Sequence, residues 1–110
     1  MREIKFRAWH KPFKDNDFGA GYKYGNNVIS FHDISPEKYE LEQYTGFKDF
    51  AGDEIYEGDI LADMDNGFVI GAVSYGDGSY WCGQDLLIDC LDCAIAGNIH
   101  ENPELLEVDE

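Results

Sequence analysis

The stretch from Leu41 to Leu61, which reads LEQYTGFKDFAGDEIYEGDIL, constrains the fold more than any other part of the sequence. Within it, Lys48 to Asp53 places Asp and Gly where a tight turn needs them. From Glu54 to Leu61, alternate residues point to opposite sides with the period of a β-strand, and Gly58 predicts a bend or bulge. A sharp bend at such a glycine is one way in which a small sheet curls into a barrel. Seven residues supply a dense apolar and aromatic set: Tyr44, Phe47, Phe50, Ile55, Tyr56, Ile60 and Leu61.

Further short strands are predicted on both sides of this stretch. Residues 3–9 alternate as in a half-buried strand, and its basic residues, which include Lys5 and Arg7, are expected to pair with carboxylates elsewhere in the chain. Asn66-Gly67 between two apolar runs predicts a hairpin that pairs 60–64 with 68–75. The strands are expected near 3–9, 54–64, 68–75, 79–83 and 94–100, with further short strands at 21–24 and 28–32 in the N-terminal part.

Helical structure is expected to be short. Ser35-Pro36 has the form of a helix start or a turn, and Asn102-Pro103 predicts a short terminal helix. Residues 85–93 fit either a helical turn or an irregular loop, and 107–110 are expected to fray. The pattern therefore predicts an all-β fold, mainly β with at most short helices, in which a small meander closes into a barrel after an N-terminal β segment.

Length and composition predict one domain, with two possible lobes at 1–43 and 44–110. Apolar residues make up 44% of the 110 positions, which is enough for a hydrophobic core. Eight residues are expected to be largely buried: Phe6, Trp9, Tyr44, Ile55, Ile60, Val69, Ile99 and Leu105.

The formal net charge is −15, from 8 basic and 23 acidic residues. Such a surface disfavours direct binding to nucleic acid or to anionic membranes, because there is no excess of basic residues to neutralise phosphates. It suits a basic partner, or a protein site that normally holds nucleic acid. Neither a signal peptide nor a transmembrane segment is expected, because no apolar run is long enough. The acidic side chains expected on turns are Asp63, Asp65, Asp77, Asp85, Asp89 and Asp92.

Two groups of residues have side chains that could form a chemical site. Cys90-x-x-Cys93, with Cys82 and His100, has the residue types of a zinc site, but a single C-x-x-C is a weak signal, and buried cysteines acting as small apolar residues are favoured. Glu57 and Asp59 share a face if 54–61 is one strand, which would suit general acid–base work, but capping of turns is favoured. No catalytic residue, metal or cofactor is therefore predicted.

Three blocks of the sequence resemble the YopX family, small proteins found mostly in phages and prophages. The first is MREIKFRAW at residues 1–9, the second is QYTGFKDFAGDEIYEGDIL at 43–61, and the third is IAGNIHENPELL at 95–106. They span nearly the whole chain in the same order as in the family. The resemblance implies an all-β fold with an SH3-like barrel, and it implies no known activity.

Three functions remain open at this point. The favoured one is a non-enzymatic module that binds another protein in the cytoplasm of a bacterial host, where three cysteines without a secretion signal stay reduced. The second is an acidic mimic of nucleic acid that blocks a DNA-binding protein. The third is a small hydrolase using Glu57 and Asp59. The identity of the partner and the oligomeric state are not predicted.

Overall fold

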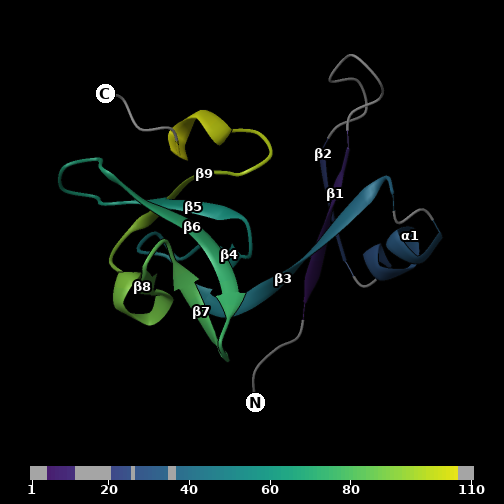
Figure 1. Ribbon diagram of the computed structural model, residues 1–110, viewed down its shortest axis with the longest axis horizontal. Helices are drawn as coiled ribbons and strands as arrows, with labels where there is room; N and C mark the ends of the chain where they lie inside the picture. Colours follow the sequence, from purple (N-terminus) through teal and green to yellow (C-terminus); the bar gives the residue numbers. More distant parts are fainter. Residues whose placement is uncertain (1–4, 12–20, 26, 35–36, 107–110) are drawn as a thin grey trace. The chain divides into compact units, whose positions relative to one another are not determined.

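The computed structural model describes residues 5–11, 21–25, 27–34 and 37–106, which form antiparallel strands, one short α-helix and two 3₁₀ turns (Figure 1). The predicted mainly β fold is confirmed. The chain divides into two compact units, Met1–Tyr44 and Thr45–Glu110. Strand β3 (Tyr39–Lys48) begins in the first unit and ends in the second. It was not among the predicted strands.

In the first unit, β1 (Phe6–His10) lies between β2 (Gly21–Tyr24) and β3, and it is antiparallel to both. The predicted short strand at 21–24 is thereby confirmed. Arg7, Ala8 and Trp9 are all buried, so the prediction that this strand is half-buried is wrong. β1 is a central strand with a neighbour at each edge, and helix α1 packs against it. The predicted start of this strand at Glu3 lies outside the described residues.

A buried ion pair joins β1 to β3. The Nε of Arg7 donates to the Oε1 of Glu42 over 2.8 Å, and the Oη of Tyr22 donates to the same oxygen over 3.0 Å. The guanidinium of Arg7 also lies 4.0 Å from the centre of the Tyr22 ring. A buried charge is tolerated when it is paired and hydrogen-bonded. The prediction that the basic residues of this strand pair with carboxylates is confirmed at Arg7.

The segment predicted as a strand at 28–32 is a helix instead, α1 (Val28–Ile34). Val28 is fully buried, and its N–H donates to the carbonyl of Gly25 over 3.3 Å at the start of the helix. Ile29 and Ile34 are exposed, so the helix buries one side of an apolar run that reads as a strand in sequence. The helix start predicted at Ser35-Pro36 lies outside the described residues, and Glu37 and Lys38 form a turn.

The bend predicted at Gly58 is confirmed. Strand β4 (Glu54–Tyr56) pairs with β3, and the turn Glu57–Gly58, where Gly58 has φ of 89°, leads into β5 (Asp59–Ala62) of a different sheet. The N–H of Gly58 donates to the carbonyl of Val73 over 2.9 Å, which fixes this corner onto the second sheet. The expected continuous strand over 54–64 is thus two strands in two sheets.

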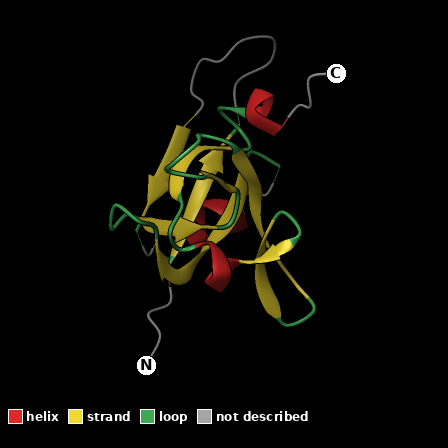
Figure 2. Ribbon diagram, turned by 90° about the vertical axis from the view of Figure 1, so that its left-hand side faces the viewer, coloured by secondary structure: helices red, strands yellow, loops and turns green. Residues whose placement is uncertain are grey.

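Five strands of the second unit form the second sheet, which curls into the SH3-like half-barrel (Figure 2). Their order is β8-β7-β6-β5-β9, and two register shifts along β5, at Ile60/Leu61 and Leu61/Ala62, bend the sheet. Besides β5, the strands are β6 (Val69–Gly76), β7 (Ser79–Cys82), β8 (Asp85–Leu86) and β9 (Ala94–Asn98).

The hairpin predicted at Asn66-Gly67 is confirmed, with a longer connection than two residues. The Oδ1 of Asp63 accepts hydrogen bonds from the N–H groups of Asp65 and Asn66, over 2.7 and 3.3 Å. The N–H of Asp63 donates to the carbonyl of Phe68 over 2.8 Å, which closes the loop. The carboxylate of Asp63 therefore caps the turn.

Two 3₁₀ turns complete the second unit. Residues 85–93, predicted as a helical turn or a loop, contain β8 and η1 (Leu87–Cys90), whose Leu87 is fully buried. The predicted terminal helix is confirmed as η2 (Pro103–Leu106). The acidic end at 107–110 lies outside the described residues.

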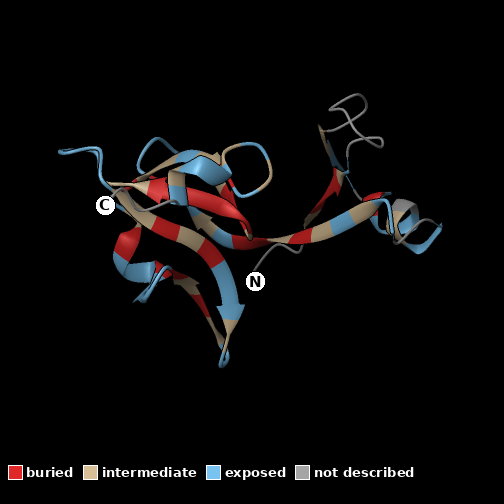
Figure 3. Ribbon diagram, turned by 45° about the horizontal axis from the view of Figure 1, so that its top comes forward, coloured by how far each residue is buried: buried red, intermediate tan, exposed pale blue. Residues whose placement is uncertain are grey.

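Buried residues lie along the strands, whereas many of the connecting turns are exposed (Figure 3). Of the predicted core, Trp9, Tyr44, Ile55 and Ile60 are buried. Ile99 is exposed, because β9 ends at Asn98 and Ile99 lies in the following turn. Three residues, Phe6, Val69 and Leu105, are half-buried. The core cluster of the second unit consists of Ile55, Leu61, Val73, Tyr80, Cys82, Leu87, Cys90 and Cys93.

A close backbone approach between β6 and the residue after β7 predicts that Gly71→Ala destabilises the chain. A Cβ on Gly71, whose φ is 155°, would lie 2.5 Å from the Cα of Gly83. Overpacking of this kind costs about 1–3 kcal/mol of unfolding free energy, measured by urea denaturation. Gly76→Ala, in the same strand with open space around its Cβ position, is the control. Equal losses in the two variants would contradict the close approach.

Candidate functional site

The buried carboxylate of Asp49 connects two distant parts of the second unit. Its Oδ1 accepts the N–H of Asp53 over 2.8 Å, and its Oδ2 accepts the N–H of Ile95 in β9 over 2.9 Å. The N–H of Asp49 in turn donates to the carbonyl of Asp53 over 2.9 Å. Asp49 therefore closes the turn predicted at 48–53 and attaches it to β9, and both carboxylate oxygens are used for structure.

Two further polar residues of the central stretch support its turns. The Oγ1 of Thr45 donates to the carbonyl of Ile55 over 2.8 Å. The Oδ2 of Asp59, which is 3% exposed, accepts the N–H of Tyr56 over 2.8 Å. Glu57 lies in the turn before β5 and Asp59 lies in β5. The prediction that the two carboxylates share one strand face as an acid–base pair is therefore wrong. The favoured alternative, a carboxylate that caps a turn, is confirmed at Asp59.

Asn98 plays the same part near the end of the chain. Its Oδ1 accepts the N–H groups of His100 and Glu101 over 3.0 and 2.9 Å, and its Nδ2 donates to the Oε1 of Glu101 over 2.8 Å. The Oδ1 of Asn102 accepts the N–H of Asn98 over 3.2 Å. His100 thus lies in a turn that Asn98 organises.

The three cysteines lie in the hydrophobic core of the second unit as free, buried thiols. The Sγ of Cys82 donates to the carbonyl of Gly71 over 3.4 Å. Burial raises the pKa of Cys82 from 9.0 to about 12 and that of Cys93 to about 11, and the neighbouring thiols and Asp92 add to these shifts. Metal binding and nucleophilic attack both need a thiolate, which this environment disfavours.

The four residues considered for zinc are only partly brought together. Cys90 and Cys93 are both close enough to Cys82 to raise its pKa. His100 lies in the turn after β9. Among the described residues, no three His, Cys, Asp or Glu side chains are arranged to hold a metal ion.

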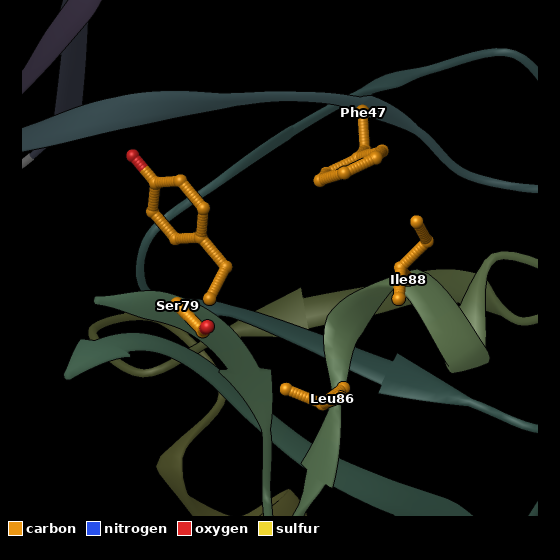
Figure 4. Close-up of a pocket in the computed structure, with 5 residues that line it drawn as sticks. Phe47, Ser79, Leu86 and Ile88 are labelled. Carbon is orange, nitrogen blue, oxygen red and sulfur yellow. The ribbon is translucent and has the colours of Figure 1, made fainter. Parts of the chain in front are cut away.

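An apolar pocket of about 270 Å³ opens on the surface of the second unit. Phe47 and Ile88 point toward one another across it, and Leu86 and Ser79 lie along its side (Figure 4). Tyr80, the fifth lining residue, is buried in the core cluster, whereas Leu86 is 38% and Ile88 61% exposed. The pocket therefore has a rigid wall set in the core and an apolar rim in contact with solvent.

The pocket residues were not among the sequence-predicted site residues. They come from β3, β7, β8 and η1, which lie up to about forty positions apart in the chain. Only the topology of the sheets brings them together. Phe47 was recognised as part of the apolar set of the central stretch, but nothing in the sequence connects it with Leu86 or Ile88.

The negative charge is concentrated in the same unit as the pocket. Met1–Tyr44 carries seven basic and seven acidic residues, whereas Thr45–Glu110 carries 16 Asp and Glu against one Lys, Lys48, and no Arg. The formal charges of the two units are therefore 0 and −15. The whole net charge of the protein belongs to the half-barrel unit.

The six aspartates predicted on turns do not all gather at one place. Burial, then Asp85, Asp92 and Asp89, raise the pKa of Cys90, so these carboxylates lie around η1. Asp63 and Asp65 precede β6, whereas Asp77 follows it. The eight residues of β6 span seven steps of about 3.3 Å, so its ends lie up to roughly 23 Å apart.

Comparisons with known proteins agree with the fold. The family model described as "YopX protein" matches residues 5–107. The chain resembles the crystal structure of protein EF1440 from Enterococcus faecalis, with a TM-score of 0.63 and 26% identity, over 97% of this chain and 100% of that one. None of the curated proteins matches the chain. Because the YopX model matches nearly the whole chain, the chain belongs to the YopX family.

Among the described residues, no helix is long and apolar enough to cross a membrane.

The two hydrogen bonds of Asp49 predict that Asp49→Asn lowers the unfolding free energy. The substitution keeps the size of the side chain but replaces one acceptor oxygen by an NH₂ group, which faces a backbone N–H. Losing a buried hydrogen bond to a charged group costs about 1.5–3 kcal/mol, measured by urea denaturation. Asp53→Asn is the control, because the Asp53 side chain is exposed. A loss no larger than in this control would contradict the structural role of Asp49.

The raised thiol pKa values predict a loss of stability at high pH. The pKa of an unfolded thiol is 9.0, whereas burial raises the pKa of Cys82 in the folded protein to about 12. The stabilising contribution is therefore present below about pH 9 and is lost as the pH rises toward the folded pKa, because the unfolded state binds fewer protons. We expect the urea midpoint to fall less between about pH 8 and about pH 10.5 in Cys82→Ala than in the wild type.

Val73→Ala is the matched control for this experiment, because it removes buried volume from the same cluster without removing a thiol. Its midpoint should fall with pH as steeply as that of the wild type. Identical pH dependence in all three proteins would show that Cys82 does not titrate differently on folding.

Proposed function

We propose that this member of the YopX family is a non-enzymatic protein-interaction module that binds its partner at the apolar pocket of the second unit. The observation that carries the proposal is the exposed rim of the pocket. Leu86 and Ile88 keep apolar side chains in water beside a wall that belongs to the core. Exposed apolar surface of this kind is typical of binding sites.

The size of the pocket favours a side chain of another protein over a cofactor. Pockets for drug-sized ligands enclose about 300–1,000 Å³ and carry a few convergent polar groups. Here the volume is about 270 Å³, and Ser79 contributes the small polar side chain of the lining. Tyr75, which is exposed and whose ring centre lies 4.9 Å from that of Tyr80, extends the aromatic surface beside the pocket.

The polar residues of the central stretch also support a non-catalytic role. Thr45, Asp49 and Asp59 use their side-chain oxygens for backbone hydrogen bonds within the fold. These hydrogen bonds give the three side chains a structural role within the fold. The module would act in the cytoplasm of a bacterial host, where free thiols such as those of Cys82, Cys90 and Cys93 stay reduced.

The charge of the second unit favours a second candidate function, mimicry of nucleic acid. A unit with a formal charge of −15 is attracted to the basic groove of a DNA-binding protein. Against this, Asp77 and the Asp63–Asp65 turn lie at opposite ends of β6, whereas mimicry needs carboxylates in rows like those of phosphates. Duplex DNA presents one charge per about 1.7 Å of its axis.

A comparative pull-down tests the two functions together. The tagged wild type, Ile88→Ser and Phe68→Ser are each exposed to bacterial lysate. Ile88 lies at the pocket, and Phe68, which is also exposed, lies on the β5–β6 loop as the control. We expect the specific partner to be lost with Ile88→Ser and kept with Phe68→Ser. It should also stay bound at about 1 M salt, where charge interactions are screened beyond about 3 Å.

Two results would contradict the interaction module. A partner that binds Ile88→Ser as well as the wild type would remove the pocket from the contact surface. A DNA-binding partner that is released by salt and displaced by added duplex DNA would instead support mimicry.

A further inference from the structure

We infer that the pocket holds one large apolar side chain of an extended peptide segment, and that the neighbours of this side chain in the segment are Lys or Arg. This inference rests on the proposed function and states the chemistry of the partner. It follows from the combination of an apolar pocket and a formal charge of −15 within one unit.

The lining of the pocket selects the apolar anchor. Phe47 and Ile88 face each other across it, and Leu86 lies beside them (Figure 4). Phe47 packs against the core cluster and Tyr80 belongs to it, so this wall is held in place before a ligand arrives. Anchors that fill such preformed pockets account for most of the binding energy in protein interfaces.

The surroundings of the pocket select basic neighbours. Asp85 and Asp89 are exposed, and each lies next to a lining residue in the chain, Leu86 or Ile88. Within the part of the chain that the structure describes, neither carboxylate forms a salt bridge. Lys48, the one Lys or Arg of the unit, follows Phe47 in β3, and the 16 Asp and Glu residues of the unit far outnumber it.

The same charge argues against other occupants. A second copy of the chain would bring another unit of charge −15 against the first, which opposes association. Nucleic acid and anionic membranes are repelled for the same reason. A peptide with Lys or Arg beside its anchor is attracted, and the aliphatic stems of these residues can lie along the apolar rim.

The experiment uses the full chain and a short fluorescent peptide that has one phenylalanine between two pairs of lysines. Fluorescence anisotropy at about 50 mM salt, where the Debye length exceeds 10 Å, should show saturable binding. Two control peptides replace the phenylalanine by serine or the lysines by glutamates. We expect the serine peptide to bind at least about tenfold more weakly, and the glutamate peptide not to bind.

Variants of the protein locate the binding site. Ile88→Ser should weaken binding of the phenylalanine peptide about tenfold, because it removes one side of the pocket. The double variant Asp85→Asn/Asp89→Asn should weaken it several-fold and reduce its dependence on salt. Phe68→Ser and Asp65→Asn, which change exposed residues of the β5–β6 loop, are the matched controls and should leave binding unchanged.

Some outcomes would overturn the inference. Equal binding of the phenylalanine and serine peptides would show that charge alone attracts them. Equal binding by Ile88→Ser and the wild type would place the peptide elsewhere. Because all five substituted side chains are exposed, a urea midpoint close to that of the wild type should accompany each result.

The peptide and pull-down experiments fail in different ways. If no peptide binds, but Ile88→Ser still loses the partner from lysate, the proposed function stands. The inference that the partner has Lys or Arg beside its apolar anchor is then wrong. If the peptide binds at the pocket, but the captured partner is indifferent to Ile88→Ser, the peptide site stands and the proposed function is wrong. If neither depends on Ile88, both are wrong.

Discussion

The carboxylate of Asp49 joins segments 46 residues apart, and the second unit depends on it. It accepts one N–H within its own turn and one from Ile95 in β9. The N–H of Phe50 adds a bond to the carbonyl of Cys93 over 2.9 Å, so the turn after β3 is attached to the chain at the start of β9. A buried carboxylate is tolerated only when its oxygens are satisfied. The turn and β9 therefore stabilise each other, and these bonds fix the position of β9, the outer strand of the half-barrel.

The stretch that identifies the family thus specifies a scaffold. Thr45, Asp49 and Asp59 each form a hydrogen bond with a backbone group. Asn98, in the last of the three blocks that resemble the family, does the same. The side-chain oxygens of these residues form hydrogen bonds inside the fold. The surface of the second unit instead carries an apolar pocket and a large excess of carboxylates. A function built on this surface can differ between proteins that share the scaffold.

The sequence predicted those parts of the structure that depend on local patterns. The bend at Gly58, the hairpin at Asn66-Gly67 and the short terminal helix all follow from turn chemistry. Strand β3 was missed because Glu42, a charged residue, takes a buried position through its pair with Arg7, which alternation of apolar residues does not reveal. Helix α1 was read as a strand because its β-branched, apolar sequence fits both. The pocket depends on four separate elements, and no local pattern predicts which of their residues meet.

The segregation of charge into the half-barrel gives the pocket and the carboxylates separate physical roles. Exposed ion pairs contribute only about 0.2–1 kcal/mol each, so Asp85 and Asp89 cannot hold a partner by themselves. A field of one sign over a whole unit does raise the rate of encounter with a basic partner, by a factor that falls as salt is added. The side chain that enters between Phe47 and Ile88 is then desolvated, and its loss of contact with water sets how slowly the complex separates. Attraction and retention thus reside in different groups, so a partner lacking either the basic residues or the apolar anchor is rejected at a different step.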